Sequence, residues 1–66
     1  MFSKPRILLR LGDVLLRVGL SRSTIYRLIS TGEFPSPVRL GPRSVAWRAE
    51  EVDEWVNRRP SAKRGS

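Results

Sequence analysis

The 66-residue sequence contains neither cysteine nor histidine. The absence of cysteine excludes a disulfide and a thiolate zinc site, and the absence of histidine removes the commonest general base and the commonest metal ligand. Four of the six acidic residues fall within 50–54, in the pattern of a solvated helix start rather than a paired-carboxylate active site. The residues therefore predict a protein that is not an enzyme and that holds no metal and no cofactor.

Long apolar runs are also missing. No stretch approaches the length of about 20 apolar residues that a membrane span needs. The start, "MFSKPRILLRLGD", lacks the apolar segment and the small-residue cleavage site of a signal peptide. Since 66 residues suffice for one domain with a small core, we expect a single soluble, cytoplasmic domain that contacts no membrane.

Positive charge is present in excess. Thirteen basic residues stand against six acidic ones, giving a net charge of +7, and eleven of the thirteen are arginine. The planar guanidinium fork suits phosphate groups and guanine edges, so this composition favours a nucleic-acid partner. A GC-rich genome would account for part of the arginine count, but it would not account for the net charge.

Two amphipathic helices joined by a short connection are predicted in the first half of the chain. Apolar residues recur at helical spacing over 11–18, and Gly19 follows as a left-handed cap. Ser21 is predicted to cap a second helix over 21–31, with its hydroxyl accepting from an amide of the first turn, and Gly32 ends that helix. A linker of three or four residues with a glycine is typical of a helix-turn-helix.

The second half favours strands and then another helix. Alternating apolar residues predict a two-stranded hairpin over about 37–40 and 44–48, with "GPR" at 41–43 as its turn. A last helix begins near Ala49, and its acidic start and basic end complement the helix dipole. Upstream, "ILL" at 7–9 fits either a short strand or the lead into the first helix.

The predicted elements define a fold class. A two-stranded hairpin is not stable alone, so it must pack on the helices, with Trp47 and Trp55 as the largest core side chains. The order helix, helix, hairpin, helix predicts a mainly α fold with a small β-hairpin over residues 7–59. Residues 1–6 are expected to form a loose N-terminus, and residues 60–66 a disordered basic tail.

The outer face of the predicted second helix carries arginines, a tyrosine and small hydroxyl side chains. A helix of about ten residues is about 15 Å long, and a helix fits the roughly 12 Å wide major groove of B-DNA. Arg22 is placed to direct its fork at a guanine, and Tyr26 to donate to a phosphate one turn along. A merely solvated face is the alternative, which the helix-turn-helix spacing and the net charge disfavour.

Three further arginines lie on or near the predicted hairpin. Arg43 at its tip is placed to reach a flanking minor groove or phosphate, with Arg39 and Arg48 on the strands, whereas ordinary solubilising charge is the alternative. Residues 21–30 carry +2 and residues 49–57 carry −4, so the last helix should face away from DNA. The full set of predicted DNA-contacting residues is Ser21, Arg22, Ser23, Thr24, Tyr26, Arg27, Arg39, Arg43 and Arg48.

Three segments carry a further signal: "GLSRSTIYRLI" at 19–29, "GEFPSPVRLGPRSVAWR" at 32–48 and "EVDEWV" at 51–56. In this order they resemble the AlpA family of phage and prophage transcriptional regulators, a branch of MerR-like winged helix-turn-helix domains related to excisionases. The resemblance implies a recognition helix at 21–31 and a wing tip at 41–43. It also implies regulation near an integrase gene, excision of a mobile element, or both.

Other functions stay open. Leu16 lies off the apolar stripe of the first helix, which motivates a basic protein-interaction module that binds a recombinase such as an integrase, or RNA polymerase. RNA binding is disfavoured because, with the tryptophans in the core, only Phe2, Tyr26 and Phe34 remain to stack on bases. Since one small module buries little surface on DNA, we expect several copies to bind adjacent repeats with cooperative self-association.

Overall fold

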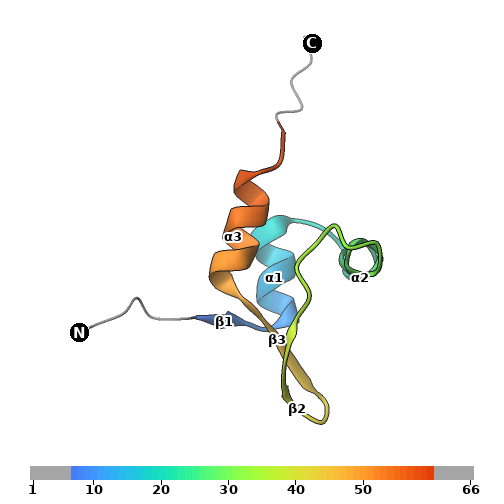
Figure 1. Cartoon of the computed structure of the whole chain (residues 1–66), viewed down its shortest axis with the longest axis vertical. Coiled ribbons are helices and arrows are strands. Elements are labelled where there is room, and N and C mark those ends of the chain that lie inside the picture. Colours follow the sequence, from blue (N-terminus) through green and yellow to red (C-terminus); the bar gives the residue numbers. More distant parts are fainter. Residues whose placement is uncertain (1–6, 61–66) are drawn as a thin grey trace, which may run out of the picture.

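The computed structural model describes residues 7–60. It contains three helices and three strands (Figure 1), which are β1 (Leu8–Leu9), α1 (Leu11–Val18), α2 (Arg22–Ser30), β2 (Val38–Gly41), β3 (Ser44–Arg48) and α3 (Ala49–Asn57). The predicted order of helix, helix, hairpin and helix is confirmed, and β1 resolves the alternative left open for 7–9. The predicted loose start over 1–6 lies outside the described residues, and so does the predicted disordered tail over 60–66 apart from Pro60, which is exposed beyond the end of α3.

The strands form one antiparallel sheet in the order β1-β3-β2. On one side of β3, Leu9 lies opposite Trp47, and the amide of Ala49 donates to the carbonyl of Ile7 at 2.9 Å. On the other side, Val38 lies opposite Ala46, with an irregularity in register between Arg39 and Gly41. The sheet therefore has one strand more than the predicted hairpin, because three apolar residues have no period that separates a strand from a helix start.

The core lies between the helices and one face of the sheet. Its largest fully buried side chain is Trp47, joined by Ile25, Val14 and Val52. The indole Nε1 of Trp47 donates to the carbonyl of Pro35 at 3.0 Å, so the buried polar atom is satisfied. The prediction that Trp47 is a core residue is confirmed.

The burial of Trp55 and of Phe34 differs from what the sequence predicted. Trp55 is only partly buried and packs at the margin of the core, where its Nε1 donates to the carbonyl of Glu33 at 2.6 Å. Phe34 meets its ring edge-on, with centroids 4.8 Å apart, and is itself buried. The expectation that Phe34 is an exposed aromatic residue was therefore wrong, because its ring packs into the core and against Trp55.

Glycines end the first two helices as predicted. Gly19 has a φ of 73° and its amide donates to the carbonyl of Leu15 at 2.8 Å. Gly32 has a φ of 80° and follows Thr31, the C-cap of α2. Because side-chain-bearing residues avoid this left-handed region, the two glycines determine where α1 and α2 stop, and hence where the connections begin.

A pair of glycine substitutions tests this backbone account. A Cβ added at Gly12 or Gly19 would meet nothing within 4 Å, so packing changes little in either variant. Gly12→Ala, within α1, should raise the free energy of unfolding by about 0.5–1 kcal/mol through helix propensity. Gly19→Ala should lower it by about 1–2 kcal/mol, because alanine resists a positive φ. Urea unfolding followed by circular dichroism measures both variants. Changes of the same sign in the free energy of unfolding would contradict the backbone roles given to the two glycines.

Candidate nucleic-acid interface

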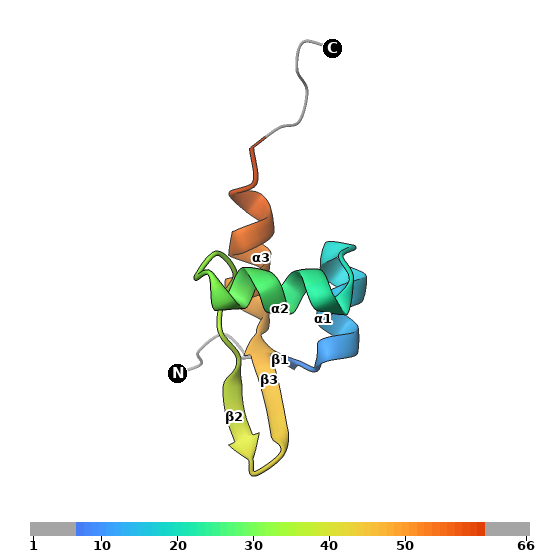
Figure 2. The same cartoon turned by 90° about the vertical axis from the view of Figure 1, so that its right-hand side faces the viewer.

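One side of α2 anchors the helix and the other is open. Ile25 is fully buried, and Leu28 and Ile29 pack against the same core. On the opposite side the side chains of Ser23, Tyr26, Arg27 and Ser30 are exposed. α2 projects from the right of the molecule in Figure 1 and crosses its front in Figure 2, so this polar face lies on the outside of the fold.

The start of α2 is built by two hydroxyl residues. The amide of Thr24 donates to Ser21 Oγ at 3.3 Å, and Ser21 Oγ donates to Thr24 Oγ1 at 3.0 Å. The predicted cap is therefore confirmed, with Thr24 rather than Ser23 as the amide donor. The amides of Arg22 and Ser23 have no partner within the helix at this position, which leaves them available to an anion.

The hairpin tip brings two of the predicted arginines together. Arg39 Nη1 donates to the carbonyl of Pro42 at 3.3 Å, so this guanidinium is folded back on the turn. Arg43 is exposed at the tip itself. In Figure 2 the hairpin extends below α2, and its tip is the part of the hairpin furthest from α3. Arg39 thus supports the turn from which Arg43 extends.

Arg48 does not join these residues. It ends β3 at the opposite end from the tip and precedes α3 directly. Its Nη1 lies 3.9 Å from Glu51 Oε2, a long ion pair between half-exposed side chains. Among the predicted contact residues, Arg48 is therefore the one that the structure separates from α2 and the hairpin tip.

The acidic residues gather on α3, as the charge pattern indicated. Asp53 accepts from Arg17 Nη1 at 2.8 and 3.1 Å, which ties α3 to α1, and Glu54 pairs with Arg58 at 2.7 Å. These exposed pairs contribute little stability, about 0–1 kcal/mol each. They fix acidic side chains on α3, a helix separate from α2, which projects to the right in Figure 1.

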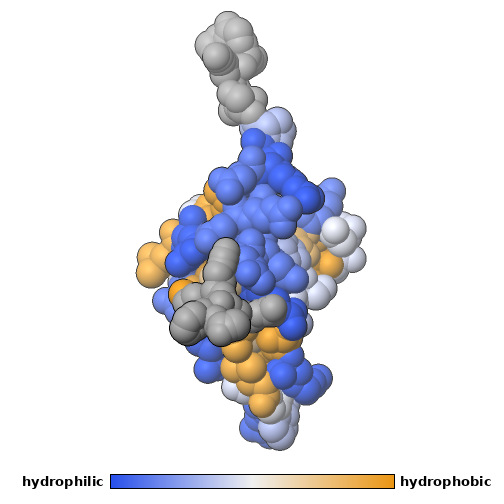
Figure 3. Space-filling model, turned by 60° about the vertical axis from the view of Figure 1, so that its left-hand side comes forward, coloured by the Kyte–Doolittle hydropathy of each residue, from blue (hydrophilic) through white to orange (hydrophobic). Residues whose placement is uncertain are grey.

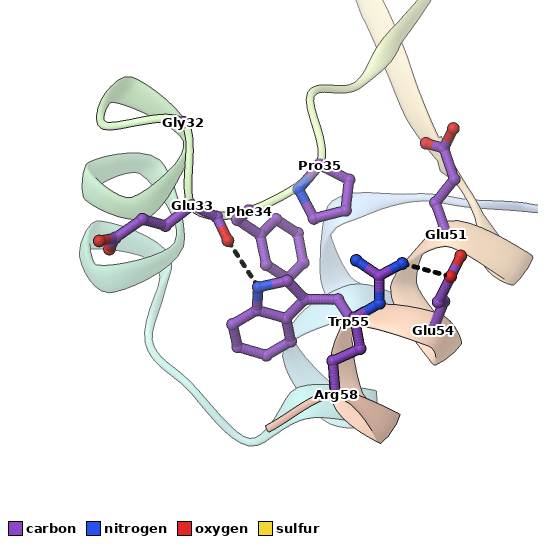
Figure 4. A pocket seen from close by; sticks show the side chains of 8 residues that line it. All are labelled: Gly32, Glu33, Phe34, Pro35, Glu51, Glu54, Trp55 and Arg58. Carbon is purple, nitrogen blue, oxygen red and sulfur yellow. Dashed lines mark hydrogen bonds and ion pairs between the residues drawn. The ribbon is translucent and has the colours of Figure 1, made fainter. Parts of the chain in front are cut away.

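A shallow hollow lies between α3 and the segment that follows α2 (Figure 4). In it Trp55 forms the floor beside Phe34, and the dashed lines mark its bond to Glu33 and the Glu54–Arg58 pair. Carboxylates repel phosphate, so this hollow is not suited to nucleic acid. Its lining residues are Gly32, Glu33, Phe34, Pro35, Glu51, Glu54, Trp55 and Arg58.

The comparison with known proteins agrees with this geometry. The sequence model of the family described as "Prophage CP4-57 regulatory protein (AlpA)" matches residues 7–60. The chain belongs to the AlpA family. The resemblance noted in the sequence is thereby confirmed, and it covers every residue that the structure describes.

Two relatives are similar to this AlpA-family chain. The DNA-binding transcriptional activator AlpA of Escherichia coli (strain K12) is 36% identical over 58 residues, covering 79% of this chain and 83% of the relative. The uncharacterized protein ORF88 of Enterobacteria phage P4 is 54% identical over 48 residues, covering 73% of this chain. The chain spans about half, 54%, of the length of the phage relative.

The family is described as one of regulatory proteins, which agrees with the prediction that the chain is not an enzyme. Within residues 7–60 the structure contains no group of three metal-ligating side chains. In the same range no helix is long and apolar enough to cross a membrane.

One exposed residue on the polar side of α2 lies outside the predicted set of DNA-contacting residues. Ser30 lies one turn after Arg27 on the exposed side of α2, and its Oγ donates to the carbonyl of Arg27 at 2.8 Å. The spacing of Ser23, Arg27 and Ser30 at i, i+4 and i+7 is the signal that marks them as one stripe.

Ser21→Ala tests the local structure of the interface. Loss of the cap should lower the free energy of unfolding by about 0.5–1 kcal/mol, because one amide of the first turn loses its acceptor. Ser23→Ala is the matched control, since the exposed Ser23 hydroxyl makes no hydrogen bond to any residue within 7–60, and it should change stability by less than about 0.5 kcal/mol. Thermal unfolding of both variants measures this, and equal losses would show that the cap does not stabilise α2.

Proposed function

We propose that this chain is a sequence-specific double-stranded DNA-binding protein with a winged helix-turn-helix. In this proposal α1 and α2 form the helix-turn-helix, and the β2–β3 hairpin is the wing. The recognition helix over 21–31 enters the major groove, and the wing tip over 41–43 contacts the flanking minor groove or backbone.

The observation that carries the proposal is the segregation of charge around α2. Its exposed side carries Arg22 and Arg27 with no acidic residue between 21 and 30, while four carboxylates are held on α3. A protein that exposed charge only for solubility would have no reason to keep acids from this one helix. Phosphate, by contrast, attracts the arginines and repels the carboxylates.

The dimensions of the interface suit B-DNA. The nine residues of α2 give a rod about 14 Å long, and the groove that receives it is about 12 Å wide. Small hydroxyl residues on the outward side allow the backbone to approach the bases. The capped start of α2 also presents free amides, which suit a phosphate oxygen.

The biological role that we propose is that of a small regulator of a phage or mobile element, an excisionase, or both. Support comes from the family description and from the printed name of the Escherichia coli relative, a DNA-binding transcriptional activator. Such a protein acts in the cytoplasm on nucleoid DNA. Because a single module of this size buries only about 600–1,000 Å² on DNA, we propose that several copies bind adjacent repeats cooperatively.

An apolar surface away from α2 favours a second candidate function, a protein-interaction module for a recombinase or RNA polymerase. Leu16 is 85% exposed on α1, beside Ile7 and Leu8 in a shallow groove between α1 and β1. Figure 3 shows hydrophobic surface on this flank and on the hairpin, between hydrophilic regions. A module with only this function would bind duplex DNA without preference for any site.

Selection of bound duplexes from a random pool separates the two candidate functions. We expect one consensus motif to be enriched, and its affinity to fall with salt. About five phosphate contacts would give a slope of log K against log salt near −4.5. Footprinting on a natural array of this motif should show neighbouring sites filled together. Enrichment of no motif, or a flat salt dependence, would exclude sequence-specific DNA binding by this chain.

Substitution at the wing tip tests the role of the hairpin. Arg43→Ala should weaken binding to all duplexes by a similar factor and should reduce the salt slope by about 0.9, because it removes one phosphate contact. Arg58→Ala removes the same charge from α3, where the side chain pairs with Glu54, and should leave the slope nearly unchanged. If Arg43→Ala and Arg58→Ala change the salt slope by the same amount, the hairpin affects binding only through the net charge of the protein.

A further inference from the structure

The angular positions of residues around α2 separate its two arginines. A helix turns about 100° per residue, and the buried stripe of Ile25, Leu28 and Ile29 marks the side that faces the core. On this measure Arg27 lies about 150° from the middle of the buried stripe, almost directly outward. Arg22 lies only about 70° from it, on the flank of the helix.

The neighbours of Arg27 leave it room. Ser23 and Ser30, one turn before and one turn after, are the other members of the outward stripe, and both are small. Ser30 Oγ is folded onto the helix, where it donates to the carbonyl of Arg27 at 2.8 Å. Arg27 is therefore the one long side chain between two short ones on the part of α2 that would lie deepest in a groove.

The neighbours of Arg22 differ. Arg22 is the first residue of α2, beside the free amides of the first turn. Tyr26, 44% exposed, lies one turn further along the same flank. When the outward stripe of a helix faces the base edges, its flanks face the walls of the groove, where the phosphates lie. A guanidinium, a phenol and two amides on one flank suit a phosphate.

We infer that Arg27 is the specificity-determining side chain, which reads a guanine through the paired N7 and O6 acceptors of its major-groove edge. Arg22 is then a phosphate contact with Tyr26, which reverses the role that the sequence alone suggested for it. The inference rests on the proposed function, because it assumes that α2 enters the major groove. Its chemical basis is that the planar guanidinium fork presents two donors that match the N7 and O6 acceptors of guanine together.

The test uses the full chain and the duplex motif that the random pool selects. Binding constants are measured for that motif and for a duplex of scrambled sequence, and their ratio is the selectivity. Arg27→Ala should lower the selectivity about 5–150-fold, the range expected for one lost bidentate base contact. Arg27→Lys should lower it less, because an ammonium group can still donate to guanine without the geometry of the fork. Arg22→Ala should weaken binding to both duplexes by a similar factor, and Arg22→Lys should restore most of that loss. Circular dichroism of all four variants checks that the fold is retained.

Modified DNA identifies the contact itself. In the selected motif each guanine is replaced in turn by 7-deazaguanine, which lacks the N7 acceptor. One position should weaken binding of the unmodified protein about tenfold and should have little effect on Arg27→Ala, because that variant has already lost the contact.

The outcomes are distinct. Full selectivity in Arg27→Ala, or a 7-deazaguanine effect that disappears in Arg22→Ala instead, overturns the assignment while DNA binding stands. Failure of the unmodified protein to prefer any duplex overturns the proposed function, and this inference with it.

Discussion

Burial of Trp47 is the interaction on which the rest of the structure depends. The side chain stands on β3, the central strand of the sheet, which also contacts α1 and α3. Its complete burial contributes roughly 2–3 kcal/mol, a large share of the 5–15 kcal/mol that stabilises a typical domain. Its indole donates to the carbonyl of Pro35, so the same residue holds the segment between α2 and the hairpin.

This arrangement connects the two parts of the proposed interface. Trp47 lies on the hairpin that carries Arg43, and it packs in the same core as Ile25 of α2. Trp55 adds a second tie, because it holds the carbonyl of Glu33 and the ring of Phe34 just after α2 ends. The helix and the hairpin are therefore held relative to each other by aromatic residues in the core and at its margin, and the polar side chains of α2 remain outside.

The charged side chains are distributed unevenly between the helices. The structure contains no buried polar or charged residue within 7–60, so every described ionisable group lies where solvent or a partner can reach it. Three of the four acidic residues of α3, Asp53, Glu51 and Glu54, pair with Arg17, Arg48 and Arg58, whereas α2 carries no acidic residue. Because exposed ion pairs are weak, this distribution of charge changes the free energy of unfolding little. It leaves the side of α2 free of negative charge, which suits an anionic polymer.

Local sequence determined most of the elements of this protein. The stripe over 11–18, the left-handed glycines at Gly19 and Gly32, and the cap at Ser21 depend on residue types and spacing within a single turn, so they are present as predicted. The family motifs also lie in the sequence itself. What only the tertiary structure decided depends on distant partners: β1 is a strand because Leu9 meets Trp47, and Phe34 is buried because Trp55 packs against it.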